Sequence, residues 1–421
     1  MKSTAMILMM VIIAILMNCS GAEASKLLVF MDRIQSDHLR AYGLAFWTLS
    51  CGHEIKWVLN YRGGAFILPD LSPVREKAAI MGVSFQPLDS AQESSIYTAV
   101  EDENMEVVVL EKAPRVAIYS PPENDPWDDA VTMALEYSQI PYDKVWDKEV
   151  LKGKLSEYDW LHLHHEDFTG QHGKFYGSFK DVAWYRKRVM DYQRVATELG
   201  YSSVSEEKKA VAREISSFVT SGGFLFAMCS ATDSLDIALS AEGVDIVSPE
   251  LDGTPVDPDA QGKLNFARTM SFQNFHLITN PMIYEFSDID VDPRQYSEEG
   301  FRGDFSLFEF SAKFDRACTI LTQCHVRRVK GFLGQTTAFT SKLLKPSVRV
   351  LGGIDEGTAK YVHGNFGEGT FTFMGGHDPE DFAHIVGEPP TMLSLHKDSA
   401  GYRLILNNIL FPAAKKKKRK T

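Results

Sequence analysis

Short apolar runs alternate with amphipathic stretches along most of the chain, which is the pattern of strands that alternate with helices. The run Phe224 to Met228 is apolar at every position, as expected for a strand covered on both faces of a parallel sheet. The pattern predicts an α/β fold with a doubly wound, mostly parallel sheet of the flavodoxin-like kind. Other strands expected in this sheet are Arg115 to Ser120, Tyr142 to Trp146, Tyr158 to His164, Phe305 to Phe310, Val348 to Leu351 and Thr370 to Met374, and the helices expected around it are Phe179 to Leu199, Ser205 to Thr220 and Tyr402 to Leu410.

The alternation begins near the N-terminus and starts a second series at Pro114. Residues 25–112 have their own βαβ rhythm, and we assign them to a smaller N-terminal α/β domain. Residues 113–412 form the larger domain, with a turn-rich, acidic insertion at about 249–303. The elements expected in the N-terminal domain are strands at Lys26 to Met31 and Glu54 to Asn60, a helix over Asp37 to Ser50, and helices capped by Ser72 and Ser90.

The first residues of the chain predict export. Lys2 precedes an uninterrupted apolar run from Ala5 to Met17, which suits the core of a signal peptide and is shorter than the ~20 residues of a membrane-spanning helix. Ala22 and Ala24 are small residues at the two positions that a signal peptidase reads, and they predict a signal peptide over 1–24 that is cleaved before Ser25. Attachment of a lipid at Cys19 is the alternative. In both cases we expect an exported protein, periplasmic or held at the cell envelope, that is otherwise soluble.

Charge is distributed unevenly along the chain. The net charge is −12, yet residues 415–420 carry six positive charges, so the rest of the molecule carries −18. An acidic surface argues against nucleic acid as a partner, because phosphates bind to basic surfaces. We expect a small-molecule, glycan or peptide ligand instead, and we leave the oligomeric state open. Residues 413–421 form a flexible basic tail that either contacts an acidic envelope surface or only aids solubility.

Cysteine is scarce, with five in 421 residues, which excludes a disulfide-rich scaffold. Cys318 and Cys324 lie in a strand-like run, where their separation in sequence places them too far apart for a disulfide. Cys229 differs from them because it follows an apolar strand and precedes a helix near Asp233. The positive end of a helix dipole lowers the pKa of a cysteine and favours the nucleophilic thiolate. A small buried side chain without chemistry is the structural alternative.

Further reactive side chains follow other predicted strands. Because the carboxyl ends of parallel strands share one edge of a sheet, we expect these side chains to lie near Cys229. His377 follows the strand at 370–374 and is the candidate base, with Glu380 or Asp378 as the carboxylate that orients it. The candidate substrate-binding residues at the same edge are Trp127, Asp128, His164, His165, Glu166, Asp167 and Ser230.

This arrangement resembles the class I glutamine amidotransferases over roughly residues 114–412. That family has its cysteine in a strand–turn–helix and a His-Pro-Glu motif after a late strand, in the same chain order. The resemblance implies that Cys229 is the nucleophile, His377 the base and Glu380 the orienting carboxylate. The chain departs from the family in three places. The run 227–231 (AMCSA) has no glycine beside the cysteine, and 164–167 (HHED) stands where the family has a glycine-rich oxyanion loop. The motif is also extended to His-Asp-Pro-Glu, which makes Asp378 an equal candidate.

Nearly the full chain is similar to a family of exported bacterial proteins that is labelled asparagine synthetase B. The matching stretches include 37–43 (DHLRAYG), 60–64 (NYRGG), 158–170, 224–234 and 375–381. Glutamine-dependent asparagine synthetases resemble an N-terminal-cysteine glutaminase joined to a domain with a Ser-Gly-Gly-x-Asp-Ser loop for ATP. In this chain the Ser-Gly-Gly of 221–223 runs directly into the strand at Phe224. We therefore expect no ATP site and no cofactor.

Three functions remain open from the sequence. The first is a cysteine hydrolase or amidotransferase that acts on an amide or ester, and the second is a binding protein without catalysis for a small polar or glycan ligand. The third is a metal-dependent hydrolase, but its local cluster needs distant ligands such as His172 or His377, and we assign no metal. The local residues of the cluster considered for that hydrolase's metal are His162, His164, His165, Glu166 and Asp167.

A separate candidate site is the alternating set Asp288, Asp290 and Asp292. These residues form either a calcium site or a solvated strand face.

Overall fold

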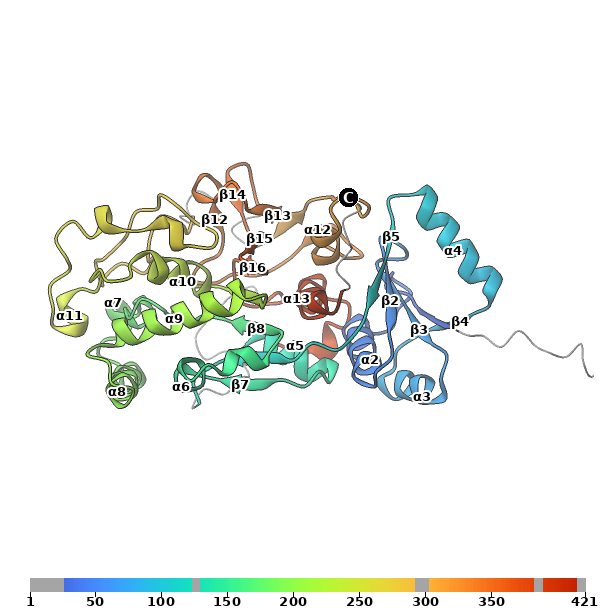
Figure 1. Cartoon of the computed structure of the whole chain (residues 1–421), viewed down its shortest axis with the longest axis horizontal. Coiled ribbons are helices and arrows are strands. Elements are labelled where there is room, and N and C mark those ends of the chain that lie inside the picture. The colour runs from blue at the N-terminus through green and yellow to red at the C-terminus, as the bar shows by residue number, and fades with distance from the viewer. Residues whose placement is uncertain (1–25, 123–128, 292–302, 382–388, 415–421) are drawn as a thin grey trace, which may run out of the picture.

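The computed structural model describes residues 26–122, 129–291, 303–381 and 389–414 of the 421-residue chain (Figure 1). Within these ranges the strands form a five-stranded sheet, a nine-stranded sheet and a two-stranded ribbon, and helices pack against both large sheets. The prediction of an α/β fold is confirmed. The helices are α2 (His38–Ser50), α3 (Ser72–Met81), α4 (Ser90–Asp102), α5 (Ala130–Ser138), α6 (Asp147–Leu151), α7 (Tyr176–Phe179), α8 (Ala183–Glu198), α9 (Val204–Thr220), α10 (Ala231–Ser240), α11 (Pro249–Asp252), α12 (Arg316–Leu321) and α13 (Ala400–Leu410).

The five-stranded sheet is built from the N-terminal part of the chain in the order β4-β1-β3-β2-β5. Each of its pairings is antiparallel, while helices and strands alternate as predicted except that β2 is followed directly by its neighbour β3. The reason lies in the connection between β2 and β3, a tight turn over 60–64 in which Asn60 and Arg62 have positive φ. A turn of this length joins only antiparallel strands. The strands are β1 (Lys26–Val29), β2 (Ile55–Leu59), β3 (Ala65–Pro69), β4 (Gln86–Leu88) and β5 (Glu106–Leu110).

The nine-stranded sheet is parallel in one half and antiparallel in the other. The parallel half has the order β7-β6-β8-β9-β16, and β15, β13, β10 and β11 extend it with antiparallel pairings. The sequence predicts a mostly parallel sheet. The observed sheet is mixed. The parallel strands are β6 (Val116–Tyr119), β7 (Asp143–Val145), β8 (Trp160–Leu163), β9 (Phe224–Met228) and β16 (Gly369–Met374); the others are β10 (Phe305–Leu307), β11 (Arg328–Val329), β13 (Arg349–Gly353) and β15 (Tyr361–Phe366), and the ribbon pairs β12 (Phe339–Thr340) with β14 (Thr358–Ala359).

Alternate residues of the central strands enter two different hydrophobic cores. In β9, Phe224, Phe226 and Met228 pack in the core shared with α2, α5 and α13. Leu225 and Ala227 pack on the opposite face, in the core that includes α9 and α10. Both faces of this strand are therefore covered, which explains why every residue of β9 is apolar.

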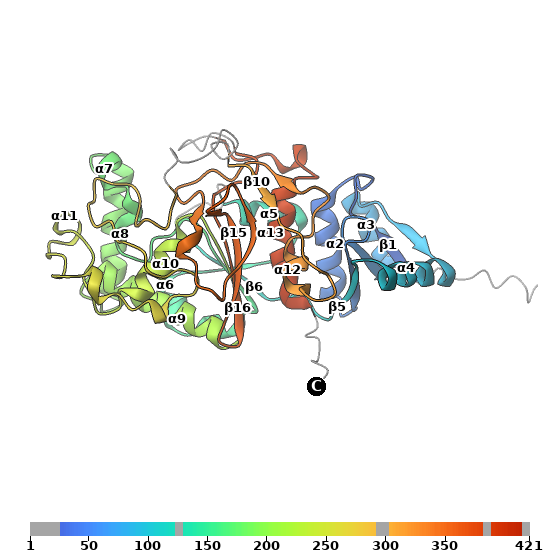
Figure 2. The same ribbon diagram turned by 90° about the horizontal axis from the view of Figure 1, so that it is seen from above.

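A single core joins the two large sheets. It runs from the five-stranded sheet through α2, α5 and α13 to the nine-stranded sheet, so these helices are packed between the sheets (Figures 1 and 2). Helix α2 lies so close to α5 that a Cβ on Gly43 would be 1.9 Å from the Ser138 carbonyl oxygen. Helix α4 covers the outer face of the five-stranded sheet with a smaller core.

Several local predictions need correction. Helices α3 and α4 begin at Ser72 and Ser90, but their N-caps are Leu71 and Asp89, and the Asp89 side chain accepts from the Gln92 amide. Cys318 lies in helix α12 and not in a strand, because the apolar run around it packs one helical face into the core between the sheets. The four cysteines of the described residues, Cys51, Cys229, Cys318 and Cys324, are all free thiols.

Candidate functional site

The candidate site lies where β8, β9 and β16 end beside one another. Strands β16 and β9 are parallel, with Met374 opposite Met228, so the residues that follow them emerge at the same edge. Strand β8 is the parallel neighbour of β9 on its other side. The predictions that 115–120, 158–164 and 224–228 form parallel strands of one sheet, and that Cys229 and His377 share an edge, are therefore confirmed.

Cys229 occupies a strained turn between β9 and α10. Its φ is +52°, a left-handed conformation that residues other than glycine rarely adopt and that is costly for a side chain of this kind. The turn is fixed to both neighbouring strands. The Cys229 amide donates to the Met374 carbonyl (3.2 Å), and the Ala231 amide donates to the His164 carbonyl (3.0 Å). The sequence predicts this turn, although no glycine is present to relieve the strain.

Backbone N–H groups of Ser230, Gln335 and Thr336 donate to the sulfur of Cys229. Burial nevertheless raises the pKa of the Cys229 thiol, because the side chain is only 1% exposed, and these donors and the nearby Asp233 carboxyl do not reverse that effect. The expected acid shift of this thiol is therefore wrong. The donors from 335–336 come from a loop that the sequence analysis did not connect with the site.

Three histidines gather at the same edge. His164 and His165 directly follow β8, and His377 follows β16. The His164 and His377 ring centroids are 4.3 Å apart, and those of His165 and His377 are 5.6 Å apart with the rings stacked. One ligand atom of each ring lies within 4.8 Å of the others. Imidazoles at these distances can act as a base, bind a substrate or hold a metal ion.

Asp129 supports this cluster and was missed in the sequence. It caps α5, where its carboxylate accepts from the Val131 and Thr132 amides, and it also contacts His164 Nδ1 at 3.0 Å. Burial alone would raise the pKa of Asp129, but the imidazoles of His162 and His164 hold it well below its usual range. An acid directly before an apolar helix is a recognisable N-cap, yet its contact with β8 depends on tertiary structure.

The two candidate orienting carboxylates have other contacts. Glu380 Oε2 lies 3.2 Å from His396 Nδ1. Asp378 accepts from the Tyr402 hydroxyl at 2.9 Å and from the Glu380 amide. Burial raises the pKa of both carboxyls. The role of orienting His377 stays a prediction for each of them.

The predicted substrate-binding residues separate into two groups. His164, His165 and Ser230 adjoin the candidate nucleophile and base. Glu166 instead turns toward α8, where it accepts from the Tyr192 hydroxyl, and Asp167 closes its own loop by accepting from the Thr169 and Gly173 amides. Asp167 thus satisfies polar groups of its own loop, while Glu166 joins the loop to α8. Trp127 and Asp128 lie outside the described residues.

Buried charged groups near Cys229 were also missed. Asp233 accepts from the Thr336 hydroxyl, and burial raises its pKa to about 7. Lys360 donates to the Phe332 and Thr337 carbonyls, and burial lowers its pKa to about 7. Both side chains hold the 332–338 segment, which supplies two of the sulfur donors.

The proposed calcium alternative is not supported by the placement of its residues. Asp290 is partly buried, and burial together with Asp233 raises its pKa well above the usual range, whereas Asp288 is half-exposed and contacts His276. Asp292 lies outside the described residues.

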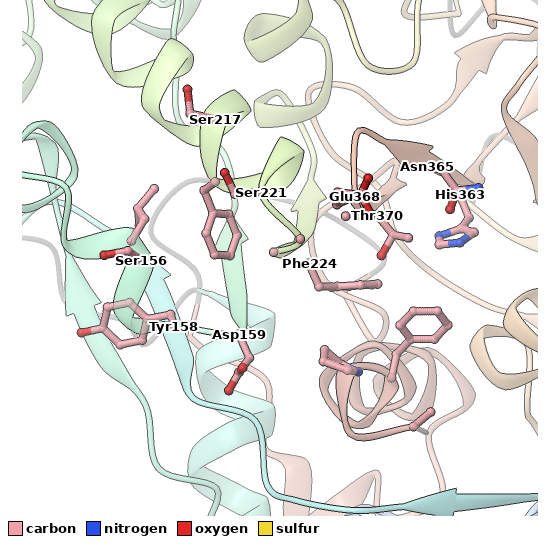
Figure 3. A pocket seen from close by; sticks show the side chains of 18 of the residues that line it. Ser156, Tyr158, Asp159, Ser217, Ser221, Phe224, His363, Asn365, Glu368 and Thr370 are labelled. Atoms are coloured by element: carbon pink, nitrogen blue, oxygen red, sulfur yellow. The ribbon is translucent and has the colours of Figure 1, made fainter. Parts of the chain in front are cut away.

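A cavity of about 670 Å³ lies at the other end of the parallel strands, where they begin (Figure 3). Its lining includes residues at or directly before the starts of β8, β9 and β16, such as Asp159, Phe224 and Thr370. His363 also faces it, and burial lowers the pKa of this histidine to about 4. The clustered imidazoles and the strained cysteine are at the carboxyl ends of these strands, so we place the candidate site there.

No protein-family model and no curated protein matches the chain. Among solved structures, it is similar to the cytoplasmic proteins STM3548 of Salmonella typhimurium and STM1381 of Salmonella typhimurium LT2, at 10% and 12% identity. Each match covers 72% of this chain and 100% of the other, with a TM-score of 0.36. The exo-β-1,4-mannosidase Op5Man5 of Opitutaceae bacterium strain TAV5 matches at 12% identity, 68% of this chain and 34% of that chain, with a TM-score of 0.26. We transfer no activity from these proteins.

The expectation of an exported protein is corrected by these comparisons. Both Salmonella proteins are described as cytoplasmic, and we do not retain the periplasmic or envelope location for this chain. The signal-peptide region 1–24, Cys19 and the tail from 415 onward lie outside the described residues. Within those described, helices that are both long and apolar enough to cross a membrane are absent.

Proposed function

We propose that this protein is a cysteine-dependent hydrolase or amidotransferase that acts on an amide or ester through Cys229. The observation that carries the proposal is the strained turn at Cys229, with φ of +52° and backbone N–H groups of Ser230, Gln335 and Thr336 aimed at the sulfur. A nucleophile on a strained strand-to-helix turn, with the N–H of the next residue available to the substrate oxygen, is the arrangement of nucleophile elbows.

The parallel half of the sheet supports a flavodoxin-like, class I glutamine amidotransferase-like domain. Numbered in chain order, its five described strands lie as 2-1-3-4-5, which is the flavodoxin order. In such sheets the reactive groups gather at the carboxyl ends of the strands, where Cys229 and His377 lie. The family label asparagine synthetase B remains a prediction from the sequence, and we propose no ATP-dependent step.

The thiol needs a base, because burial raises its pKa and leaves it protonated at neutral pH. In the proposed reaction the thiol proton moves to the His377 imidazole, and the sulfur adds to the carbonyl carbon of the substrate. The backbone N–H groups stabilise the negative oxygen, and the amine or alcohol leaves with the proton held by His377. Water or an amine then releases the acyl group from the thioester and restores the thiol.

Ligand binding without covalent chemistry is the second candidate. It is favoured by the 1% exposure of Cys229 and by the contact of Glu380 with His396. In this function the imidazoles and backbone N–H groups bind a small polar or glycan ligand, and the cysteine is a packed side chain.

A burst experiment separates the two candidates. A p-nitrophenyl ester is mixed with the metal-free protein, and nitrophenol release and intact mass are followed. Catalysis predicts one acyl group per chain, mapped to Cys229, which Cys229→Ser abolishes and His377→Gln slows by about 10²-fold or more. Cys51→Ser is the matched control, because Cys51 is an exposed thiol outside the site.

An acyl group that maps elsewhere, or a burst that persists in Cys229→Ser, contradicts the catalytic function. Absence of any acylated species across esters and amides of different size, with retained binding of a polar ligand, establishes the second candidate.

A further inference from the structure

We propose that His164, His165 and His377 bind one divalent transition-metal ion of the Zn²⁺ class. The three side chains offer one nitrogen each within 4.8 Å of one another. Nitrogen ligands at ~2.1 Å from a tetrahedral Zn²⁺ lie roughly 3.4 Å apart, so small rotations of the rings complete the site. Three protein ligands leave one coordination position open, as in zinc sites that carry out or control chemistry.

The strongest support comes from the two nitrogens of His164. Its Nδ1 lies 3.0 Å from the Asp129 carboxylate, which can only accept, so Nδ1 carries the proton and Nε2 has the free lone pair. His164 is 3% exposed, and its Nε2 is buried without a hydrogen-bond partner among the described residues. A buried lone pair without a partner is costly, and an ion in the cluster would bind it.

Asp129 therefore has the position of an outer-shell carboxylate. Metal-binding histidines usually donate their second ring nitrogen to a carboxylate or carbonyl, which fixes the ring and makes the ligand more basic. Asp129 is itself fixed by the Val131 and Thr132 amides and the Thr132 hydroxyl at the start of α5. The direction of the His164 ring is thus set by a helix end rather than by a loop.

A second group, formed by Asp129, His162 and His164, also has atoms within 4.8 Å of one another. His162 Nε2 is likewise buried without a hydrogen-bond partner in the described part of the chain, but it already lies 3.4 Å from the Asp129 carboxylate. His162 is fully buried beside the rings of Trp160 and Phe226, and its Nδ1 contacts the Phe226 carbonyl. The Asp129 oxygens are already occupied by α5. We therefore infer that Asp129 and His162 hold His164 in place, and that the metal binds to His164, His165 and His377.

The ion would also control the thiol, and this part rests on the proposed function. A Cβ on Gly334 would lie 3.1 Å from Cys229 Sγ and 3.0 Å from the His377 backbone nitrogen, so sulfur and this nitrogen are no more than about 6 Å apart. A bound ion takes the His377 lone pair that would otherwise accept the thiol proton. Zn²⁺ is therefore a reversible inhibitor of the Cys229 reaction, without any change in oxidation state.

Metal binding is tested on the full-length protein after treatment with a chelator. Co²⁺ is titrated while the visible absorption of the ion is recorded, and Zn²⁺ affinity is measured by competition. We expect one ion per chain, with Asp129→Asn weakening the affinity by about 10–100-fold, since asparagine keeps the helix cap but not the charge. His164→Gln, His165→Gln and His377→Gln should each weaken it more than Asp129→Asn does.

The matched control is His276→Gln, because His276 is exposed, contacts Asp288 and is not a member of the cluster. Each variant is checked for native helix content and unfolding midpoint. Failure of the wild type to bind one ion, or affinity unchanged in His165→Gln or His377→Gln, overturns the metal site.

The effect on the thiol is measured separately as the ester burst with and without one equivalent of Zn²⁺. Loss of the burst with the ion, and its recovery with a chelator, supports inhibition; a burst that Zn²⁺ leaves unchanged overturns it. A metal-free protein without a burst contradicts the proposed function, while the Co²⁺ titration still decides the metal site.

Discussion

Two histidine clusters in this protein use the same side chain in opposite ways. At the junction of the two sheets, His38 and His325 face each other with ring centroids 4.7 Å apart, and the buried guanidinium of Arg403 lies against both. At the edge of the nine-stranded sheet, His164 and His377 are equally close, but no arginine or lysine is among the described contacts of His164.

The difference is visible at single nitrogen atoms. His38 Nε2 contacts the Asp32 carbonyl and its Nδ1 contacts Arg403, so both nitrogens have partners. His164 Nε2 has none among the described residues. A cluster that already contains its cation stabilises the fold, whereas a cluster with a buried, unused lone pair is suited to a ligand. Residue type and burial alone do not distinguish the two.

The largest expected effect comes from removing the resident cation. Arg403→Met leaves the Met31 and Gly63 carbonyls and two imidazoles without their donor, so we expect a loss of about 3–5 kcal/mol in the free energy of unfolding. Urea unfolding at pH 7 measures it. Arg213→Met is the control, since Arg213 forms only a surface ion pair and should change stability by less than ~0.5 kcal/mol. Equal effects of the two variants would show that the junction does not depend on Arg403.

The stability of the two regions should change in opposite directions as the pH falls. Burial, and then Arg403, lowers the pKa of His38 to about 3, so the unfolded state binds more protons below pH 6.5 and the junction loses stability as the pH falls. Burial raises the pKa of Asp233 to about 7, so its contribution is complete below its unfolded value and is lost as the pH rises through 7.

Hydrogen exchange at pH 4.5 and 7.5, corrected for intrinsic rates, measures both responses. We expect protection of α13 to fall at pH 4.5 and protection of α10 to rise, each by roughly 2–3 kcal/mol. Asp233→Asn should remove much of the α10 response and leave that of α13 unchanged. If protection of α10 and α13 changed in the same direction with pH, the two regions would not differ in the way proposed.

A smaller effect is expected on the reactivity of the thiol. Burial is the main cause of the raised pKa of Cys229, and the Asp233 carboxyl adds to it. Asp233→Asn should therefore speed alkylation of Cys229 by up to about tenfold at pH 8 and very little at pH 6, where the acid is mostly protonated. Peptide mass mapping of iodoacetamide adducts in the presence of a chelator gives the rates. The exposed Asp288→Asn is the control, and an equal rate at pH 8 in both variants would exclude the electrostatic coupling.

The smallest effect is expected from Gly334→Ala. A methyl group there would lie 3.0–3.1 Å from Cys229 Sγ, Gly376 Cα and the His377 nitrogen, so Gly334→Ala should cost about 1–2 kcal/mol and disturb the space between thiol and imidazole. We expect slower acylation of Cys229 and weaker Co²⁺ binding. Gly82→Ala, with open space around it but a φ of +68°, gives a comparable strain far from the site and should leave both properties unchanged.

The sequence predicts the parallel half of the sheet well, because buried strands such as 224–228 and their connecting helices have a strong local pattern. It also places Cys229, His377 and His164 at one edge, since the register of parallel strands fixes which ends meet. The antiparallel half was only partly anticipated: β15 was missed because its register depends on pairing with β13 and β16.

The chemistry of the site was less predictable than its location. The pKa of Cys229 depends on its burial under the loop at 332–338, and the contact of Asp129 with His164 joins residues that are 35 positions apart. The partner of Glu380 is His396, sixteen positions further along the chain. None of these contacts has a local pattern, because each depends on how distant segments pack.

The helix α13 lies between the two sheets, although it comes from the end of the described chain. Its Asn407 side-chain oxygen accepts from the Tyr42 hydroxyl, and its Arg403 donates to the Met31 carbonyl. In the turn that follows α13, the Ala413 carbonyl accepts from the Glu111 amide. During synthesis the five-stranded sheet and α2, which packs on its inner face, are complete in sequence after residue 110, yet α13, which packs against α2, follows only after nearly 300 further residues. The nascent chain must therefore expose apolar surface for about 15–60 s at ordinary rates of translation. The last helix closes the fold. We therefore expect that chaperone binding during that interval, and the integrity of α13, decide whether the protein accumulates in the cell.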